Sequence, residues 1–164
     1  MPHVEIRKAV KADADAILEI LQSVALWLET AGPGKLWSAS SFSLSGVVAR
    51  IEAEEAVVLE ADGTAAAIMY LQGRDDIFWP EDPAGEALYI HKLAIARPFA
   101  GLGLSRLMLD WAADQARQAG RHYLRLDCAP RAKLIAIYRD AGFSRVGDDI
   151  VVEGYSVTRL QRSI

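Results

Sequence analysis

Two glycines immediately before a strongly amphipathic segment give the first indication of a ligand site. Gly101 and Gly103 precede Leu104, where apolar residues begin to recur at helical spacing. Glycine lets backbone N–H groups approach a bound group closely, and the first amides of a helix carry the positive end of its dipole. The turn therefore predicts a phosphate or pyrophosphate site, although two glycines before a helix also occur in an ordinary turn.

Two common nucleotide motifs do not explain this turn. A P-loop needs Gly-Lys-Ser/Thr, whereas Gly103 is followed by Leu104 and Ser105. A dinucleotide fingerprint needs three spaced glycines, usually near the start of its strand–helix–strand unit. The turn must hold its anion in another way.

Composition limits the class of protein. The chain has 164 residues, 52% of them hydrophobic and 24% charged, which predicts a single globular domain spanning residues 1–164. The net charge of −4 gives no overall basic surface for nucleic acid. No apolar run approaches the roughly 20 residues that span a bilayer. A single cysteine, Cys128, and the lack of zinc-ligand spacing predict neither a disulfide nor a metal site. We therefore expect a cytoplasmic protein without nucleic-acid or membrane partners.

Hydrophobic periodicity predicts the elements that must position the turn. Short apolar runs predict strands at residues 4–9, 56–60, 65–71, 87–95, 123–128, 143–146 and 155–161. Helical spacing predicts helices at residues 11–28, 44–54, 104–119 and 131–141. Residues 31–34 should end the first helix, Asp62-Gly63 should turn a hairpin, and residues 74–85 should form a loop. The order predicts an α/β (α+β) fold, a mixed sheet with helices packed against it.

Two of these predictions specify which residues share a face. Strict alternation along residues 87–95 would place one set on a common face: Tyr89, His91, Leu93 and Ile95. The helix at 104–119 should bury one stripe: Leu104, Leu107, Met108, Trp111, Ala112 and Ala116.

Two segments carry a family resemblance. Residues 88–112 read LYIHKLAIARPFAGLGLSRLMLDWA, and residues 138–143 read YRDAGF. They resemble the Gcn5-related N-acetyltransferases, the GNAT superfamily. The resemblance implies a central mixed, mostly antiparallel sheet flanked by helices, with an acyl-CoA cleft between splayed central strands.

The resemblance also implies a co-substrate, acetyl-CoA, and no metal. The backbone of Leu93, Ala94 and Ile95 would pair with the pantetheine amides. The pyrophosphate would bind the turn, at Gly101, Leu102, Gly103, Leu104, Ser105 and Arg106. Two positions depart from the family pattern: Ala100 replaces a polar residue, and Arg131 replaces an asparagine. Arg131 would either contact a coenzyme phosphate or lie in solvent, and we expect weaker coenzyme binding rather than none, because backbone amides dominate such cradles.

Acid–base roles follow from the same resemblance. His91 stands where aralkylamine-type members have a base, which would accept a proton from an amine that is mostly protonated at neutral pH. Tyr138 stands where the family has an acid that donates toward the leaving thiolate. Each residue also has a structural interpretation, His91 as a core histidine and Tyr138 as an ordinary residue of an amphipathic helix.

Aromatic residues suggest an acceptor site. Trp27, Trp37, Phe78 and Trp79 lie in the N-terminal helices and the long loop, where this family builds acceptor sites, although most tryptophans simply pack a core. Tyr89, on the same strand face as His91, would line the site. Four loop acids would either attract a cationic acceptor or be solvated: Asp75, Asp76, Glu81 and Asp82. Cys128, on an apolar strand, is expected to be a buried inert thiol.

The resulting hypothesis is an acyltransferase (EC 2.3.1.-). It would move acetyl from acetyl-CoA to a primary amine of a small molecule or peptide by direct attack in a ternary complex. The alternatives are a non-catalytic acyl-CoA-binding or sensing module, favoured by Ala100 and Arg131, and a structural protein that binds no coenzyme. A homodimer is possible through an edge strand near the C-terminus.

Overall fold

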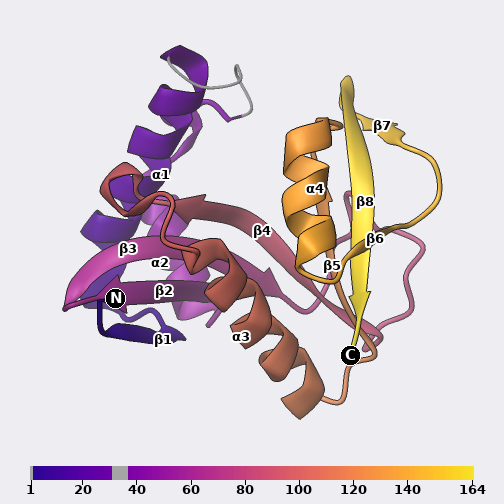
Figure 1. Ribbon diagram of the computed structural model, residues 1–164, viewed down its shortest axis with the longest axis horizontal. Helices are drawn as coiled ribbons and strands as arrows, with labels where there is room; N and C mark the ends of the chain where they lie inside the picture. Colours follow the sequence, from indigo (N-terminus) through magenta and orange to yellow (C-terminus); the bar gives the residue numbers. More distant parts are fainter. Residues whose placement is uncertain (1, 31–36) are drawn as a thin grey trace. The chain divides into compact units, whose positions relative to one another are not determined.

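The chain forms a mixed α/β fold (Figure 1). The structure is a computed structural model that describes residues 2–30 and 37–164. Its strands are β1 (Val4–Lys8), β2 (Ala56–Ala61), β3 (Thr64–Gln72), β4 (Ala87–Ile95), β5 (Tyr123–Cys128), β6 (Ser144–Arg145), β7 (Ile150–Val152) and β8 (Tyr155–Ser163). Its helices are α1 (Ala14–Thr30), α2 (Leu44–Glu52), α3 (Leu104–Gln118) and α4 (Ala132–Asp140). The predicted ending of the first helix at residues 31–34 lies outside the described residues.

The chain divides into two compact units. The first comprises Met1–Tyr70 and Lys92–Met108, and the second comprises Leu71–His91 and Leu109–Ile164. Strand β4 and helix α3 each contribute residues to both units. The units are described separately below.

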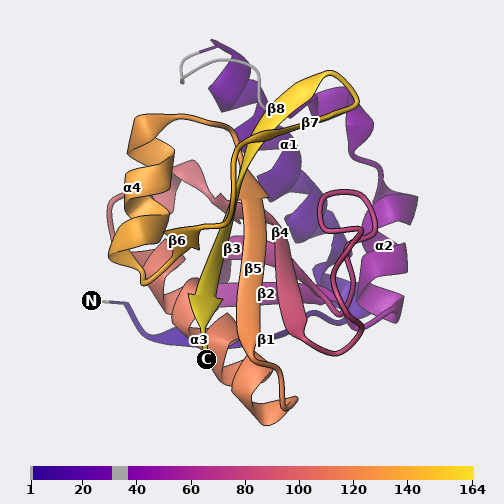
Figure 2. The ribbon, with the colours of Figure 1, turned by 90° about the vertical axis from the view of Figure 1, so that its right-hand side faces the viewer.

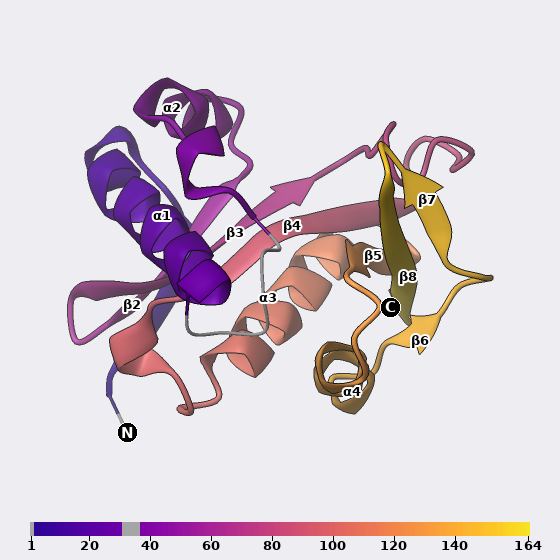
Figure 3. The same ribbon diagram turned by 90° about the horizontal axis from the view of Figure 1, so that it is seen from above.

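The first unit is a small antiparallel sheet covered by two helices. Strand β2 pairs with β1 on one side and with β3 on the other, and Asp62 and Gly63 turn the β2–β3 hairpin with φ of 50° and 80°. This confirms the predicted hairpin, because these two residue types tolerate positive φ. Helices α1 and α2 lie side by side (Figure 3) and share one core with the sheet. That core includes Ile17, Leu21, Val24, Val47, Val58 and Ile68.

The second unit is built around β5. In Figure 2, β5 lies between β4 and β8; it pairs with β4 in parallel and with β8 in antiparallel orientation. Strands β6 and β7 both pair with β8. Strand β7 was not predicted, although the turn at Glu153 and Gly154, with φ of 52° and 83°, is typical of a short hairpin.

Strand β4 does not alternate strictly along its length. Lys92, in its middle, adopts a left-handed backbone with φ of 55°. A residue in this conformation rotates the strand, so the residues before and after it do not share one continuous alternation. The predicted common face of Tyr89, His91, Leu93 and Ile95 is therefore wrong.

The helices lie where the sequence predicts them, but the residues that α3 buries differ in part from the predicted set. In α3, Leu107 is exposed and Trp111 is half-buried, whereas Leu109 and Ala113 are buried beside Met108. The buried stripe is thus rotated relative to the predicted one, because several apolar residues of this helix fit more than one helical face. None of the described helices is long and apolar enough to cross a membrane.

Candidate functional site

The turn before α3 has the backbone conformation that the sequence predicts. Gly101 and Gly103 have φ of 81° and 76°, a region that side-chain-bearing residues rarely adopt. A Cβ built on either glycine would meet no atom within 4 Å. The glycines are therefore required by the backbone path rather than by tight packing, and the space beside them is open. The first intrahelical bond runs from Leu107 N to Gly103 O, so the amides at the helix start precede any intrahelical acceptor.

The end of β4 leads into this turn. Ala94 is buried in the core of the first unit, whereas Leu93 and Ile95 are half-buried. Ala96 N donates to Ala66 O at 2.8 Å, which ties the strand end to β3. The residues predicted to pair with pantetheine thus lie on a well-anchored segment.

The β4–β5 ladder is short. It runs from Ala87–Tyr123 to Ile90–Leu126, while β5 continues along β8 as far as Cys128. His91 and Asp127 follow the last residues of this parallel pairing, one on each strand. Because parallel strands run in the same direction, the side chains that follow a paired position emerge at the same edge.

A cluster of three ionisable side chains lies at this edge. One nitrogen of His91 and one carboxylate oxygen each of Asp75 and Asp127 lie within 4.8 Å of one another. His91 Nε2 is 3.2 Å from Asp75 Oδ2. One nitrogen and two carboxylates could also hold a divalent cation. A contact between the imidazole and the Asp75 carboxylate, however, accounts for their approach without a metal, and nothing else in the described residues points to one.

Asp75 is fixed by the loop that carries it. Its Oδ1 accepts hydrogen bonds from Ile77 N at 3.1 Å and from Phe78 N at 2.9 Å. Burial opposes ionisation of this carboxyl group, but the interaction with His91 and the two backbone donors outweigh burial and lower the pKa of Asp75. The carboxylate is therefore charged at neutral pH.

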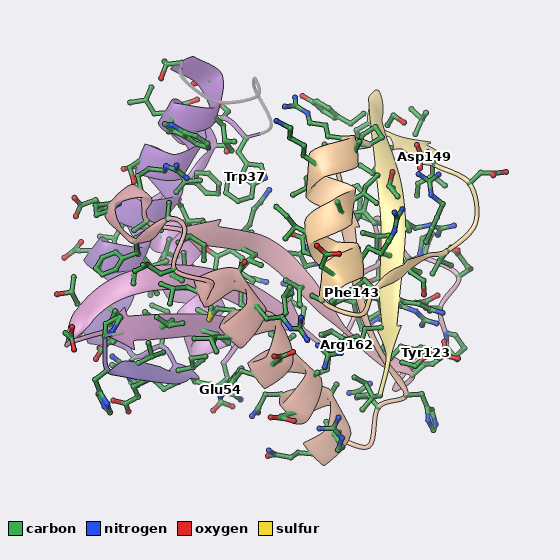
Figure 4. The ribbon with its side chains drawn as sticks, in the orientation of Figure 1. Trp37, Glu54, Tyr123, Phe143, Asp149 and Arg162 are labelled. Carbon is green, nitrogen blue, oxygen red and sulfur yellow. The ribbon has the colours of Figure 1, made fainter. Side chains whose placement is uncertain are left out.

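Tyr138 lies on the last turns of α4. Its ring contacts the ring of Phe143, edge to face, with centroids 5.9 Å apart, and Phe143 N donates to Tyr138 O. Phe143 follows the end of α4 (Figure 4), where Gly142 has a φ of 94°. Burial raises the pKa of the Tyr138 phenol, and the negative charge of Asp127 raises it further. Tyr138 therefore keeps its proton throughout the neutral and mildly basic range.

The thiol of Cys128 is suited to packing rather than to attack. Its side chain is buried in β5. Burial, aided by Asp127 and Asp149, raises the pKa of the thiol to about 12. The predicted burial of this thiol is confirmed, and its raised pKa disfavours the thiolate, which is the strongly nucleophilic form.

The predicted aromatic residues fall into two groups. In the first unit, the Arg97 guanidinium lies 3.7 Å from the centroid of Trp27. Lys92 Nζ lies 5.2 Å from the centroid of Trp37, which is labelled in Figure 4. Both tryptophans are only partly buried against the core of this unit. Each cation–π contact supplies positive charge beside an aromatic ring.

In the second unit, Trp79 and Tyr89 are both 3% exposed and form a small core with Ala87. Tyr89 Oη donates to Asp82 Oδ2 at 2.5 Å, and burial raises the pKa of this phenol to about 12. Trp79 therefore has the burial expected of a tryptophan that packs a core, and Tyr89, predicted to line the site, is buried beside it.

The acids of the loop after β3 have specific partners. Asp82 pairs with Arg125 at 2.8 Å, Glu81 pairs with Arg159 at 2.7 Å, and Asp76 pairs with Arg74 at 3.0 Å. Simple solvation therefore does not describe this loop. Asp75 is the member whose partner is a candidate catalytic residue.

The sequence does not determine two features of the site: the surroundings of Arg131, and the approach of Asp127 to His91. Arg131 is half-buried at the N-terminus of α4. Asp127 was not identified from the sequence; only the register of β4 against β5 brings it to His91. A prediction that strands 87–95 and 123–128 are parallel neighbours would have found it.

Comparison with known proteins identifies the family of this chain. The model of the acetyltransferase (GNAT) family matches residues 15–143. The chain belongs to the GNAT family. The N-acetyltransferase YesJ of Bacillus subtilis, itself uncharacterized, is 32% identical over 148 residues, which cover 86% of this chain and 82% of YesJ.

Solved GNAT structures share the fold. A GNAT acetyltransferase from Listeria monocytogenes is 25% identical, with a TM-score of 0.79 over 98% of this chain and 95% of that one. The yncA protein of Salmonella typhimurium, solved with its cofactor acetyl-CoA, is 23% identical, with a TM-score of 0.74 over 98% and 93% of the two chains. The expected GNAT fold, a central sheet of several strands flanked by helices, is confirmed.

Proposed function

We propose that this GNAT protein is an N-acetyltransferase that moves acetyl from acetyl-CoA to a primary amine of a small molecule or peptide by direct attack in a ternary complex. The observation that carries the proposal is the turn at Gly101 and Gly103, whose left-handed backbone and open flank suit a pyrophosphate. The acetyl-CoA in yncA and the name of YesJ support the same assignment.

The residues of the turn fit the coenzyme's anionic part. Backbone amides from Gly101 to Arg106 would hold the pyrophosphate, aided by the dipole of the 15-residue helix α3. Leu93, Ala94 and Ile95 would offer backbone groups to pantetheine, and Arg131 would add a positive charge for a phosphate. When bound, acetyl-CoA supplies the acetyl group as a thioester. Ala100 removes a polar side chain without altering these backbone donors.

Two side chains of the second unit would move the protons. An alkylamine with a pKa near ~10 must lose a proton before it attacks, and the His91 imidazole would accept that proton. Tyr138 Oη would donate toward the sulfur that leaves. The raised pKa of Tyr138 suits this role, because a donor must still carry its proton at the working pH.

A covalent enzyme intermediate is not part of the proposal. Cys128 is the single cysteine of the chain, and its thiol is buried with a pKa of about 12. Direct transfer to the amine requires no protein nucleophile.

Trp27 and Trp37 are the proposed acceptor contacts, because both rings are only partly buried. Trp79 and Tyr89 would contribute to the acceptor site mainly by supporting it, since both are buried. The loop acids, with the exception of Asp75, are engaged by arginines and are poor candidates for recognising a cationic acceptor.

A thiol-release assay tests the function. Purified protein with acetyl-CoA should release CoA in the presence of at least one acceptor from a panel of small amines, polyamines, amino acids and peptides with free N-termini. Coenzyme binding without turnover on any acceptor would support the non-catalytic module instead. Neither binding nor turnover would support a structural protein.

A further inference from the structure

The contact between Asp75 and His91 goes beyond the family motifs. Asp75 comes from the loop after β3, and His91 from the middle of β4. The His91 side chain is 20% exposed and the Asp75 side chain 4% exposed, with His91 Nε2 3.2 Å from Asp75 Oδ2. One edge of the imidazole therefore faces a buried carboxylate while part of the ring remains accessible.

The loop leaves Asp75 little freedom to turn away. Its Oδ1 is held by the N–H groups of Ile77 and Phe78, which directs Oδ2 toward the imidazole. Oδ2 is fully enclosed and accepts no hydrogen bond of good geometry from the described residues. A buried anionic oxygen without a donor is costly, so an N–H on the facing imidazole nitrogen is strongly favoured.

We propose that Asp75 is a positioning residue that keeps the His91 proton on Nε2 and leaves Nδ1 as the acceptor for the amine proton. The inference rests on the proposed role of His91 as the base. A neutral imidazole carries one N–H, and a carboxylate facing one nitrogen fixes the proton there. The geometry thus selects the tautomer as well as the orientation of the ring.

Asp127 is a second acidic group near His91 among the described residues. It comes from β5, and its carboxylate lies within 4.8 Å of both His91 and Asp75. The positive charge that forms when His91 accepts a proton would therefore arise beside two carboxylates. The same donor set could accept a divalent cation, so the experiment must separate a proton from a metal.

Nitrogen-15 NMR of the histidine side chains tests the tautomer directly. The chain has three histidines, so His91→Gln identifies the His91 signals by their loss. In wild-type protein at neutral pH, treated with EDTA, His91 should be in the Nε2–H form. An Nδ1–H form, or an equal mixture of the two, would overturn the proposal.

Asp75→Asn gives the kinetic test. The asparagine carbonyl can keep the two backbone hydrogen bonds, while its NH₂ group would face His91 Nε2 and favour the opposite tautomer. We expect kcat to fall about 10- to 100-fold, with the KM for acetyl-CoA changed less than about twofold, and the NMR spectrum to report the Nδ1–H form.

Asp76→Asn is the matched control. Asp76 has the same type of side chain and lies one position further along the loop, but it pairs with Arg74 at the surface. Its substitution should change kcat less than about twofold. Wild-type rates in Asp75→Asn, or loss of activity in EDTA that Zn²⁺ restores, would contradict the proposal. If wild-type protein acetylates no amine, the proposed function fails, and the NMR result still decides the role of Asp75.

Discussion

The two candidate regions of this GNAT protein differ in the groups that form them: one uses the backbone and the other uses side chains. The turn before α3 depends on backbone: two left-handed glycines and the first amides of a helix. The cluster around His91 depends on side chains from the loop after β3, from β4 and from β5. We expect the first region to tolerate changes of side chain that keep the backbone path, and the second to tolerate few.

This difference predicts separate kinetic effects. Substitutions in the backbone-built turn should act on coenzyme affinity, because it contacts a part of the ligand that does not react. Substitutions in the side-chain cluster should act on kcat, because those groups move protons. Of the four predictions below, those for His91 and Gly103 test this separation directly. Those for Tyr138 and Cys128, which lie outside both regions, test the proton donor and the absence of a protein nucleophile.

The largest effect is expected at Tyr138. Tyr138→Phe keeps the ring contact with Phe143 but removes the proton donor, so kcat should fall roughly 100- to 1,000-fold. Calorimetry should give an acetyl-CoA affinity within about twofold of wild type. Tyr155→Phe, which changes an exposed tyrosine, is the control and should leave both values unaltered. An unchanged kcat would remove Tyr138 from the mechanism.

A slightly smaller loss is expected at His91. His91→Gln should lower kcat about 100-fold and abolish the acid-side limb of the rate profile, where an imidazole base becomes protonated. The same substitution at the exposed His122 should leave the profile as in wild type. A profile that keeps its acid limb in the His91 variant would assign that limb to another group.

The turn should respond through affinity. Gly103→Val forces a branched side chain into a left-handed conformation, which costs about 1–2 kcal/mol. If the turn shifts to relieve this strain, the KM for acetyl-CoA should rise roughly 5- to 30-fold with little change in kcat. Gly147→Val carries similar strain, with a φ of 64° and an open flank, and should affect stability but not KM. Equal KM values for acetyl-CoA in the two variants would show that the turn does not bind the coenzyme.

The smallest effect on activity is expected at Cys128. Cys128→Ala should leave kcat within about threefold of wild type, because the thiol has no proposed chemical role. With its folded-state pKa raised to about 12, the thiol stays protonated at pH 8, so iodoacetamide should label folded protein far more slowly than unfolded protein. Rapid labelling of the folded chain that also stops turnover would reopen the question of a covalent intermediate.

Sequence patterns specify the backbone-built region far better than the other. Gly101, Gly103 and the start of α3 are contiguous, and β4 and β5 have the predicted bounds. The hairpin at Asp62-Gly63 was likewise predictable, because local residue types determine such a turn.

The side-chain cluster could not be assembled from local patterns. Asp75, His91 and Asp127 meet because of a parallel register and a loop path that no short motif encodes. The left-handed Lys92 was also unexpected, because lysine carries no preference for positive φ. Strict alternation therefore failed within β4.

Calorimetric titration of acetyl-CoA into wild-type protein and the Gly103→Val variant tests the central claim, that the turn before α3 binds the coenzyme through its backbone. We expect one binding event per wild-type chain, with CoA alone also binding, and weaker binding by the variant. No detectable heat or complex with excess acetyl-CoA, CoA or longer acyl-CoA would contradict the account.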